Sequence, residues 1–413
     1  MSLWVRTREV ADPGDLLARL PDRAGLAMIT DGEGLIGWGE ALRLSIPGGP
    51  DRFARAARAL EDAAASAVVD DPVALPGSGL VAFLAGTFAP DSEAETTLVV
   101  PERVVGRRDG RAFATAIGAS GPPADPTDAV PRAQVALADP PRVRERGAGL
   151  DEVAWLDRVA KAVDRLRAGE LGKVVLARDV GVWADEPFDP RAVARRLAAR
   201  FPGCHTVMVD GMVGASPELL VGRRGPQVRS RVLAGTTGRD ADPERDAALA
   251  RALRDSRKDR EEHDHAVASA RAALEPVCAA LEVDPEPWVL RLANVAHLAT
   301  DLRGALAEPV PVLDLVQALH PTAAVCGTPT ALAAEVIAEL EGLDRGRYAG
   351  PIGWVCGRGE GEVAIALRCA EVAGSTARLF AGAGIMPGSR PESELEETRL
   401  KLEAMRRALG VTG

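Results

Sequence analysis

The sequence lacks several features that would assign it to familiar classes of protein. No apolar run reaches the roughly 18 residues of a membrane-spanning helix. The first nine residues lack the apolar stretch of a signal peptide, so we expect the chain in the cytoplasm. Cysteine is scarce, and the five cysteines lie far apart without a Cys-x-x-Cys pair, which excludes a disulfide framework and a zinc knuckle.

Positive charge is also in deficit, because the formal net charge is −10. This balance argues against nucleic acid as a partner. It does not exclude a small anionic substrate, because a binding site responds to local charge and not to the total. The 46% hydrophobic content supplies material for a large core, and 413 residues suffice for one large domain or two ordinary ones.

Three regions differ in pattern along the chain. Residues 1–117 predict mixed strands and helices, including a helix over 51–65 and an apolar strand near 79–86. Residues 118–150 are rich in Pro, Gly, Asp and Ala, which predicts a solvent-exposed connection without packed structure. Residues 151–410 show the sharpest periodicity, and we expect them to form one structural unit with the first region.

Helices and strands are expected in a loose alternation after residue 150. The predicted helices are 151–169, 190–200, 243–274, 311–319, 328–340 and 391–409. The predicted strands are 173–180, 205–210, 218–223, 289–299, 353–356, 362–371 and 376–382. Glycine-bounded hairpins favour an α+β (mixed α/β) fold with sizeable antiparallel sheets over a doubly wound one.

Two pairs of acidic residues lie three positions apart on predicted helices. Asp259 pairs with Glu262 in this way, and Glu394 pairs with Glu397. Each pair shares a helix face, and two such faces turned toward each other would offer hard oxygen ligands to Mg²⁺. Taken alone, these pairs are more typical of solvated helix faces, since basic residues flank both.

Two further ionisable residues border apolar segments. Lys173 begins the strand Lys-Val-Val-Leu, where it is either a solvated strand end or a buried general base. Glu218 follows Ser216-Pro217 among apolar neighbours, where it is either a turn residue or a carboxyl with a raised pKa, suited to act as a general acid.

Glycine-rich turns are the third kind of candidate. Ala234-Gly-Thr-Thr-Gly and Ala381-Gly-Ala-Gly-Ile each present backbone N–H groups to an anion, and the absence of a P-loop or a dinucleotide fingerprint favours a small carboxylate over a nucleotide. The histidines show no His-Glu-x-x-His spacing, so we interpret them as structural or substrate-contacting residues and not as zinc ligands.

The order of these motifs resembles that of the chorismate-utilising enzymes, which include isochorismate, salicylate, anthranilate and aminodeoxychorismate synthases. The resemblance covers roughly residues 150–408. It is carried by Lys173-Val-Val-Leu-Ala-Arg, Ser216-Pro-Glu-Leu-Leu, Ala234-Gly-Thr, Lys258-Asp-Arg-Glu-Glu-His263, His297-Leu-Ala-Thr-Asp-Leu-Arg-Gly, His320-Pro-Thr-Ala-Ala-Val-Cys-Gly, Tyr348-Ala-Gly-Pro-Ile-Gly-Trp, Ala366-Leu-Arg-Cys-Ala, Ala381-Gly-Ala-Gly-Ile and Glu394-Leu-Glu-Glu-Thr-Arg-Leu-Lys401. It implies a single large domain whose extended, mostly antiparallel sheets form a layered core, with helices packed outside.

The resemblance also implies a role for each candidate. Lys173 becomes the base that activates water, and Glu218 the acid that protonates the departing hydroxyl. Glu262 and Glu397 become direct Mg²⁺ ligands, supported by Asp259 and Glu394. The substrate contacts become Gly235, Thr236, His297, Ala324, Tyr348, Arg368, Gly382, Gly384 and Lys401.

Lys173 and Ala324 bear on the choice within the family. The ammonia-using members usually carry glutamine where Lys173 stands, so the lysine implies water as nucleophile and no glutaminase partner. The small Ala324 resembles isochorismate synthases, whereas salicylate synthases tend to carry a hydroxyl residue there; Ala323 departs from the proline common in this motif. We therefore expect an isochorismate synthase, a Mg²⁺-dependent and monomeric isomerase serving menaquinone or siderophore biosynthesis. A salicylate synthase and an inactive chorismate-binding homologue are the alternatives.

Overall fold

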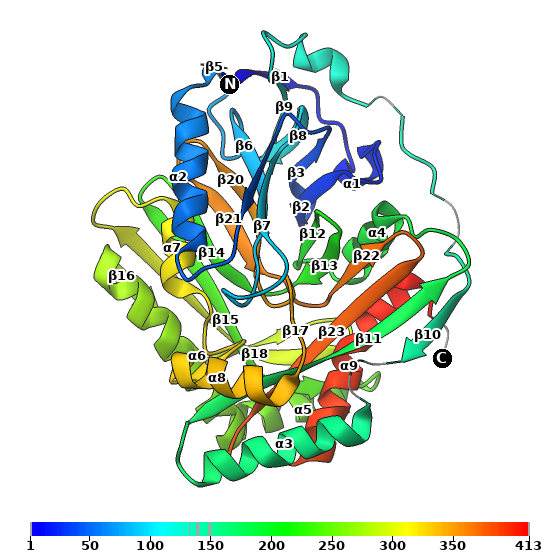
Figure 1. The fold of residues 1–413 in the computed structure, drawn as a ribbon, viewed down its shortest axis with the longest axis vertical. Coiled ribbons are helices and arrows are strands. Elements are labelled where there is room, and N and C mark those ends of the chain that lie inside the picture. Colours follow the sequence, from blue (N-terminus) through cyan, green and yellow to red (C-terminus); the bar gives the residue numbers. More distant parts are fainter. Residues whose placement is uncertain (1, 132, 138–139, 148, 150, 412–413) are drawn as a thin grey trace.

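Two large sheets pack against each other around one extensive apolar core (Figure 1). The computed structural model describes residues 2–131, 133–137, 140–147, 149 and 151–411. Within these residues the neighbouring strands of both sheets run antiparallel, except for one parallel pair at an edge of the first sheet. The expected layered, mostly antiparallel architecture is confirmed.

The first sheet joins strands from both ends of the chain. In spatial order its strands are β10 (Val143–Gly147), β11 (Lys173–Ala184), β23 (Thr376–Ile385), β22 (Cys369–Ala373), β13 (Met212–Ser216), β12 (His205–Val209), β2 (Leu26–Thr30), β3 (Glu33–Trp38), β8 (Arg103–Arg108), β9 (Arg111–Gly118), β1 (Trp4–Val10) and β5 (Val68–Asp70), with β19 (Gly327–Thr328) paired to β11. The amino-terminal third is therefore part of the same folded unit as the remainder.

The second sheet is built in the same interleaved way. Its strands in spatial order are β16 (Cys278–Val283), β18 (Val295–Leu306), β15 (Gln227–Gly238), β14 (Leu219–Arg224), β21 (Gly361–Ile365), β20 (Pro351–Cys356), β6 (Val81–Ala85), β7 (Thr96–Val100) and β4 (Leu42–Ile46), with β17 (Trp288–Arg291) paired to β18. The apolar core between the two sheets takes large side chains from both, among them Phe83, Trp354 and Leu176.

Helices cover the outer faces of the sheets. They are α1 (Leu16–Arg19), α2 (Arg52–Ala65), α3 (Glu152–Arg167), α4 (Pro190–Arg200), α5 (Pro243–Asp255), α6 (Arg257–Leu274), α7 (Val312–Leu319), α8 (Thr330–Glu341), α9 (Pro391–Leu409) and the short 3₁₀ turns η1 (Pro126–Ala129) and η2 (Glu275–Val277). A second apolar cluster joins α1, α4 and α9 to the first sheet, while α2, α6 and α7 pack on the second (Figure 1). Among the described residues, no helix combines the length and the apolar content that crossing a membrane requires.

Helix α3 forms for the reasons its sequence suggests. The Asp151 carboxylate accepts a hydrogen bond from the backbone N–H of Ala154 at 2.7 Å, which caps the first turn. The side chains of Val159, Val163 and Leu166 are buried on one face. Helices α4 and α9 likewise have the bounds expected from the sequence.

The helix predicted over 243–274 is wrong in one respect, because the structure contains two helices there. Ser256 between α5 and α6 has extended backbone angles (φ −68°, ψ 116°) and ends the first helix. Its hydroxyl oxygen accepts a hydrogen bond from the N–H of Asp259 at 3.3 Å, so Ser256 caps α6. The break gives Asp259 a place in the first turn of a new helix.

Two predicted strands are also interrupted. The strand expected over 289–299 is the hairpin β17–β18, closed by a hydrogen bond from Leu292 N–H to the Val295 carbonyl at 2.8 Å. The strand expected over 362–371 is β21 in the second sheet and β22 in the first. The crossover between them includes Arg368, whose φ of 49° lies in the left-handed region. A sheet change cannot be inferred from an apolar run alone, because both halves are equally buried.

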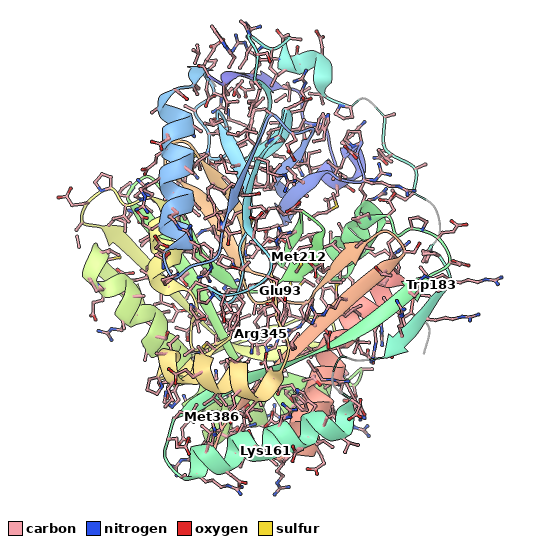
Figure 2. All side chains as sticks on the ribbon, viewed as in Figure 1. Glu93, Lys161, Trp183, Met212, Arg345 and Met386 are labelled. Carbon is pink, nitrogen blue, oxygen red and sulfur yellow. The ribbon has the colours of Figure 1, made fainter. Side chains whose placement is uncertain are left out.

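The segment 118–150 is not a bare connection. Residues 143–147 form β10, which pairs with the outer part of β11, and residues 126–129 form η1. Most of the remaining described residues of this segment are exposed or half-buried, as its composition suggested. The nearby Trp183 of β11 points away from the molecule and is 42% exposed (Figure 2).

Candidate active site

A small cavity between the two sheets contains most of the residues singled out from the sequence. Its volume is about 60 Å³, and residues of β11, β15, β18 and β23 line it together with α6, α9 and the turn 345–349. The nine expected substrate contacts all line this cavity, as do Glu218 and Glu262; the nine are Gly235, Thr236, His297, Ala324, Tyr348, Arg368, Gly382, Gly384 and Lys401.

The other four candidates lie outside the cavity lining, and three of them contact residues that line it. Lys173 contacts Glu262, and Glu397 contacts Lys401. Asp259 lies against Gly235, and Glu394 is bonded to Lys258. A larger hollow of about 950 Å³ lies on the surface beside α4, but its lining offers none of these candidate groups.

Lys173 is buried at the start of β11 and is not a solvated strand end. Its side chain is 0% exposed, and its Nζ lies 3.3 Å from Oε1 of Glu262, which projects from α6. Nζ has no hydrogen-bond partner within the described part of the chain. A Cβ added to Gly384 on β23 would lie 2.0 Å from that Glu262 oxygen. Gly384 therefore makes room for the ion pair between Lys173 and Glu262.

Glu218 lies between β13 and β14, where the chain passes from the first sheet to the second. It is almost completely buried, and burial raises the pKa of its carboxyl to about 8, despite a hydrogen bond from the Leu233 backbone and the charges of Lys173 and Arg368. Glu218 is therefore protonated at neutral pH. The sequence left two interpretations of Glu218, a turn residue or a carboxyl with a raised pKa, and its burial favours the second.

Arg368 is a half-buried cation without a carboxylate partner in the described residues. Its Nη2 donates a hydrogen bond to Nε2 of His297 at 2.8 Å, while its Nε has no partner there. An arginine only donates, so Nε2 of His297 accepts and Nδ1 carries the hydrogen, which it directs toward Thr236 Oγ1 at 3.1 Å and the Gly235 carbonyl at 3.3 Å. Burial and the nearby Arg368 lower the pKa of His297 well below its ordinary value, so this imidazole is neutral.

Tyr348 forms part of the opposite wall. Its ring stacks on Phe380 of β23 with centroids 4.9 Å apart. A Cβ added to Gly382 would lie 3.2 Å from the Tyr348 hydroxyl oxygen, so this glycine keeps a space open beside the phenol. Burial raises the pKa of Tyr348, which therefore remains a neutral hydrogen-bond donor.

Gly235 produces a bulge in β15 opposite β18. The register shifts between Ala234 and Thr236, and Gly235 has a φ of 74°, a conformation that favours glycine. The bulge allows Ala234, Gly235 and Thr236 to line the cavity in succession, where strict alternation would turn the middle residue away. A Cβ at Gly235 would lie 3.0 Å from the Cβ of Asp259.

The acidic residues of α6 and α9 are neutralised in part by lysines. Lys258 Nζ donates to Glu394 Oε1 at 2.5 Å, and Lys401 Nζ donates to Glu397 Oε1 at 2.6 Å and to the Gly382 carbonyl at 2.9 Å. Burial and repulsion by Glu397 raise the pKa of Glu394. Burial also raises the pKa of Asp259, with repulsion by Glu262 and Glu397 adding to it. The two helices therefore bring an excess of carboxylates into one buried region.

This donor set fits a magnesium ion in kind. Hard carboxylate oxygens are the ligands Mg²⁺ prefers, and it usually takes one or two of them while keeping waters. The described residues form no ready-made cluster of three candidate ligands. Burial and the neighbouring carboxylates raise the pKa values of Asp259 and Glu394, and a divalent cation beside them would favour their ionised forms.

Arg345 is a residue of the site that had no distinguishing signal in the sequence. It lines the cavity, and its charge is buried against Glu341. Lys258 stands in the motif Lys258–His263, but its contact with Glu394 of the other helix was not predicted. Arginines are common beside acidic residues in this chain, and only the fold distinguishes a buried partner from a solvated one.

Comparisons with known proteins agree with this geometry. A family model described as chorismate binding enzyme matches residues 26–410. The chain is 41% identical over 350 residues to a Mycobacterium tuberculosis protein provisionally named isochorismate synthase MenF, covering 81% of this chain and 88% of that protein. It is 41% identical over 265 residues to isochorismate synthase DhbC of Bacillus subtilis, covering 61% and 67%. The structure of MenF, the menaquinone-specific isochorismate synthase from Escherichia coli, superposes with a TM-score of 0.79 at 26% identity, covering 98% of this chain and 94% of that one.

Proposed function

The chain belongs to the chorismate-binding enzymes, and we propose that it is an isochorismate synthase that adds water to chorismate at C2 and removes the C4 hydroxyl. Chorismate is a dicarboxylate, and three cationic side chains border the cavity: Arg345, Arg368 and Lys401. Arg345 is paired with Glu341 and Lys401 with Glu397, which leaves Arg368 without a carboxylate partner in the described residues. The expectations of a monomer without a glutaminase subunit and of a cytoplasmic location stay predictions.

The observation that carries the proposal is the guanidinium of Arg368, which is half-buried on the cavity and has no carboxylate partner among the described residues. Withdrawing a charge from water without a partner is costly, and it is tolerated where a ligand supplies the opposite charge. Arg368 presents a planar donor group suited to a carboxylate, with the neutral Tyr348 hydroxyl and the loop at Gly235 on the same cavity. Chorismate entry would need the cavity to widen, because a pocket of about 60 Å³ is small for such a ligand.

The two groups proposed for proton transfer come from different elements. Glu218 carries a proton at neutral pH and is suited to protonate the departing hydroxyl. Lys173 is buried beside Glu262, and its Nζ has no hydrogen-bond partner in the described residues. Since a lysine accepts a proton only in its neutral form, its proposed role as base requires that the ion pair with Glu262 separates and that Nζ gives up its proton before water is activated. An acid and a base held apart can divide proton transfer without a covalent intermediate.

Glu262 and Glu397 are the residues we propose to hold Mg²⁺, with Asp259 and Glu394 supporting them. When bound, the ion would neutralise and orient the ring carboxylate of the substrate. Lys173 and Lys401 neutralise the two proposed ligands in the structure described here. We therefore expect these two ion pairs to separate when Mg²⁺ binds.

We propose that Ala324 helps to end the reaction at isochorismate, before the enolpyruvyl group is eliminated. It lines the cavity with a methyl group, so it offers no hydroxyl to assist a second step. We expect the enolpyruvyl group to stay on the product. A salicylate synthase would instead release it as pyruvate.

Incubation with chorismate and Mg²⁺, followed by chromatographic identification of the products, tests the proposal. Isochorismate without pyruvate is the expected result. Salicylate with pyruvate would favour the salicylate synthase, and the absence of any turnover would favour a binding homologue.

Lys173→Ala and Glu218→Gln test the two proton-transfer roles. Each is expected to lower kcat by about 10²–10⁴-fold, the usual contribution of a positioned acid or base. Circular dichroism should show a folded protein in both cases. Near-normal turnover in either variant would remove that residue from the mechanism.

A further inference from the structure

The turn that carries Tyr348 has a strained backbone beside the cavity. Tyr348 N–H donates to the Arg345 carbonyl at 2.9 Å, and Gly350 N–H donates to the Arg347 carbonyl at 3.0 Å. Between them, Ala349 has a φ of 58°, in the left-handed region that is unfavourable for a residue with a Cβ. Such a conformation persists only where the surroundings hold it.

Arg345 holds the turn from the inner side. Its guanidinium donates to the carbonyls of Val175 at 2.8 Å and Val325 at 2.9 Å, and to Glu341 Oε2 at 2.9 Å. It also lies over the ring of Phe88, 4.1 Å from the centroid. Figure 2 shows Arg345 near the centre of the molecule. These contacts join the turn to two walls of the cavity.

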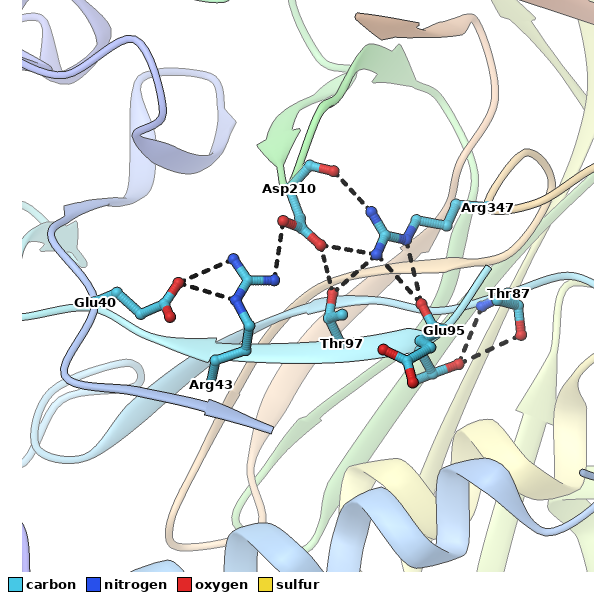
Figure 3. A network of polar contacts seen from close by, with 8 residues as sticks. Glu40, Arg43, Thr87, Glu95, Thr97, Asp210 and Arg347 are labelled. Carbon is cyan, nitrogen blue, oxygen red and sulfur yellow. Dashed lines mark hydrogen bonds and ion pairs between the residues drawn. The ribbon is translucent and has the colours of Figure 1, made fainter. Parts of the chain in front are cut away.

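Arg347 holds the same turn from the outer side, outside the cavity lining. Its Nη1 donates to the Asp210 carbonyl at 2.7 Å, and its Nη2 lies 2.7 Å from Asp210 Oδ2 (Figure 3). Further hydrogen bonds reach the Glu95 carbonyl at 3.3 Å and Thr97 Oγ1 at 3.4 Å. The side chains of Arg347 and Asp210 are only 13% and 21% exposed, so this contact is more than a loose surface pair.

Asp210 is itself fixed in place. It lies at the tip of the β12–β13 hairpin with a φ of 48°. Its carboxylate accepts from Thr97 Oγ1 at 3.0 Å and from Arg43 Nη1 at 3.0 Å (Figure 3). Arg43 in turn donates to Glu40 at 3.0 Å. The outer anchor of the turn is therefore a connected network and not a single pair.

We propose that Arg347 is a positioning residue: through Asp210 it fixes the turn 345–349, and so holds the Tyr348 hydroxyl in place for a carboxylate of the substrate. The inference rests on the proposed function, because it takes chorismate as the occupant of the cavity. Arg347 acts on affinity without touching the substrate, and neither Lys173 nor Glu218 depends on it.

A double-mutant cycle tests the inference. Arg347→Met should raise the KM for chorismate roughly three- to tenfold and leave kcat within about twofold. Tyr348→Phe removes the hydroxyl that the turn positions. In the Tyr348→Phe background, Arg347→Met should therefore raise KM no further. Asp210→Asn provides a second variant, which keeps a polar side chain at the anchor and should raise KM by a smaller factor.

Arg358→Met is the matched control. Arg358 also bonds a carboxylate, Asp71, and two carbonyls, those of Leu75 and Ser78, but it lies outside the cavity lining. The Arg358→Met substitution should leave the KM for chorismate unchanged. If Arg347→Met lowers only the melting temperature, or if its effect on KM adds fully to that of Tyr348→Phe, the inference is overturned in an active enzyme. A wild-type protein that converts no chorismate would overturn the proposed function, and this inference with it.

Discussion

Glu218 has an environment that changes its acid–base chemistry strongly from that in water. A carboxyl with an ordinary pKa of 4.5 is buried so deeply that its pKa rises to about 8. The cations Lys173 and Arg368 oppose this rise without cancelling it. Burial therefore converts an ordinary base into a group that holds a proton at neutral pH, which is the state a general acid requires.

The pH dependence of turnover follows from this shift. Because the acid form of Glu218 is the active one, kcat/KM for chorismate should fall as pH rises through about 8. Ionisation of the substrate carboxylates lies far below this range and cannot account for the fall. Steady-state rates measured between pH 6 and pH 10, at saturating Mg²⁺, would check it. A rate that stays level to pH 10 would contradict the role of Glu218 as acid.

The same shift also has a consequence for stability, which falls as pH rises. Between pH 4.5 and about 8 the folded chain keeps a proton on Glu218 that the unfolded chain releases, so this carboxyl costs more stability as pH rises through that window. Glu218→Gln removes the cost. Its free energy of unfolding relative to wild type should therefore be higher at pH 9 than at pH 5, as measured by denaturant titration.

At the level of elements, strand β23 contributes to the site mainly through Gly384, which leaves space for the side chains of Glu262 and Lys173. A Cβ at Gly384 would lie 2.0 Å from Glu262 Oε1 and 3.2 Å from Lys173 Cε. Gly384→Ala should therefore displace the ion pair between α6 and β11 and lower kcat on the order of a hundredfold. Gly388→Ala is the control, because a Cβ there meets no atom within 4 Å. Equal activity of the two variants would show that the strand tolerates a side chain at position 384.

The elements themselves were predictable where their signals are local. Asp151 caps α3 and the apolar stripe of that helix is buried, as the sequence indicated. The break at Ser256 was missed because residues 243–274 keep helical composition on both sides of it. Arg368 was predicted as a substrate contact from its motif, but its left-handed backbone at a change of sheet has no local signal. These features depend on what the segment packs against, which tertiary structure decides.

For the whole molecule, the candidate site exists only where the two sheets meet. The order of motifs predicted its members, and the nine expected substrate contacts do line one cavity. Arg345 and Arg347 could not be distinguished from other arginines, because their partners Val175 and Asp210 belong to distant segments. Long-range contacts of this kind carry no mark in the sequence near either residue.

The contact between α6 and α9 leads to the last prediction. Lys258 and Glu394 meet across 136 positions of sequence, and the excess carboxylates of these two helices repel one another. A cation that binds them joins distant parts of the chain, so Mg²⁺ should raise the melting temperature of wild type. The stabilisation should reach about 2.7 kcal/mol at a hundredfold excess over Kd, because only the folded chain presents the site. EDTA should reverse this shift and stop turnover.

Variants of the proposed ligands test which carboxylates bind the ion. Glu262→Gln and Glu397→Gln should abolish the shift in melting temperature. Glu403→Gln, which breaks a similar pair with Arg407 on the exposed side of α9, should keep it. If Mg²⁺ shifts the melting temperature of Glu397→Gln as much as that of wild type, these carboxylates do not bind the ion.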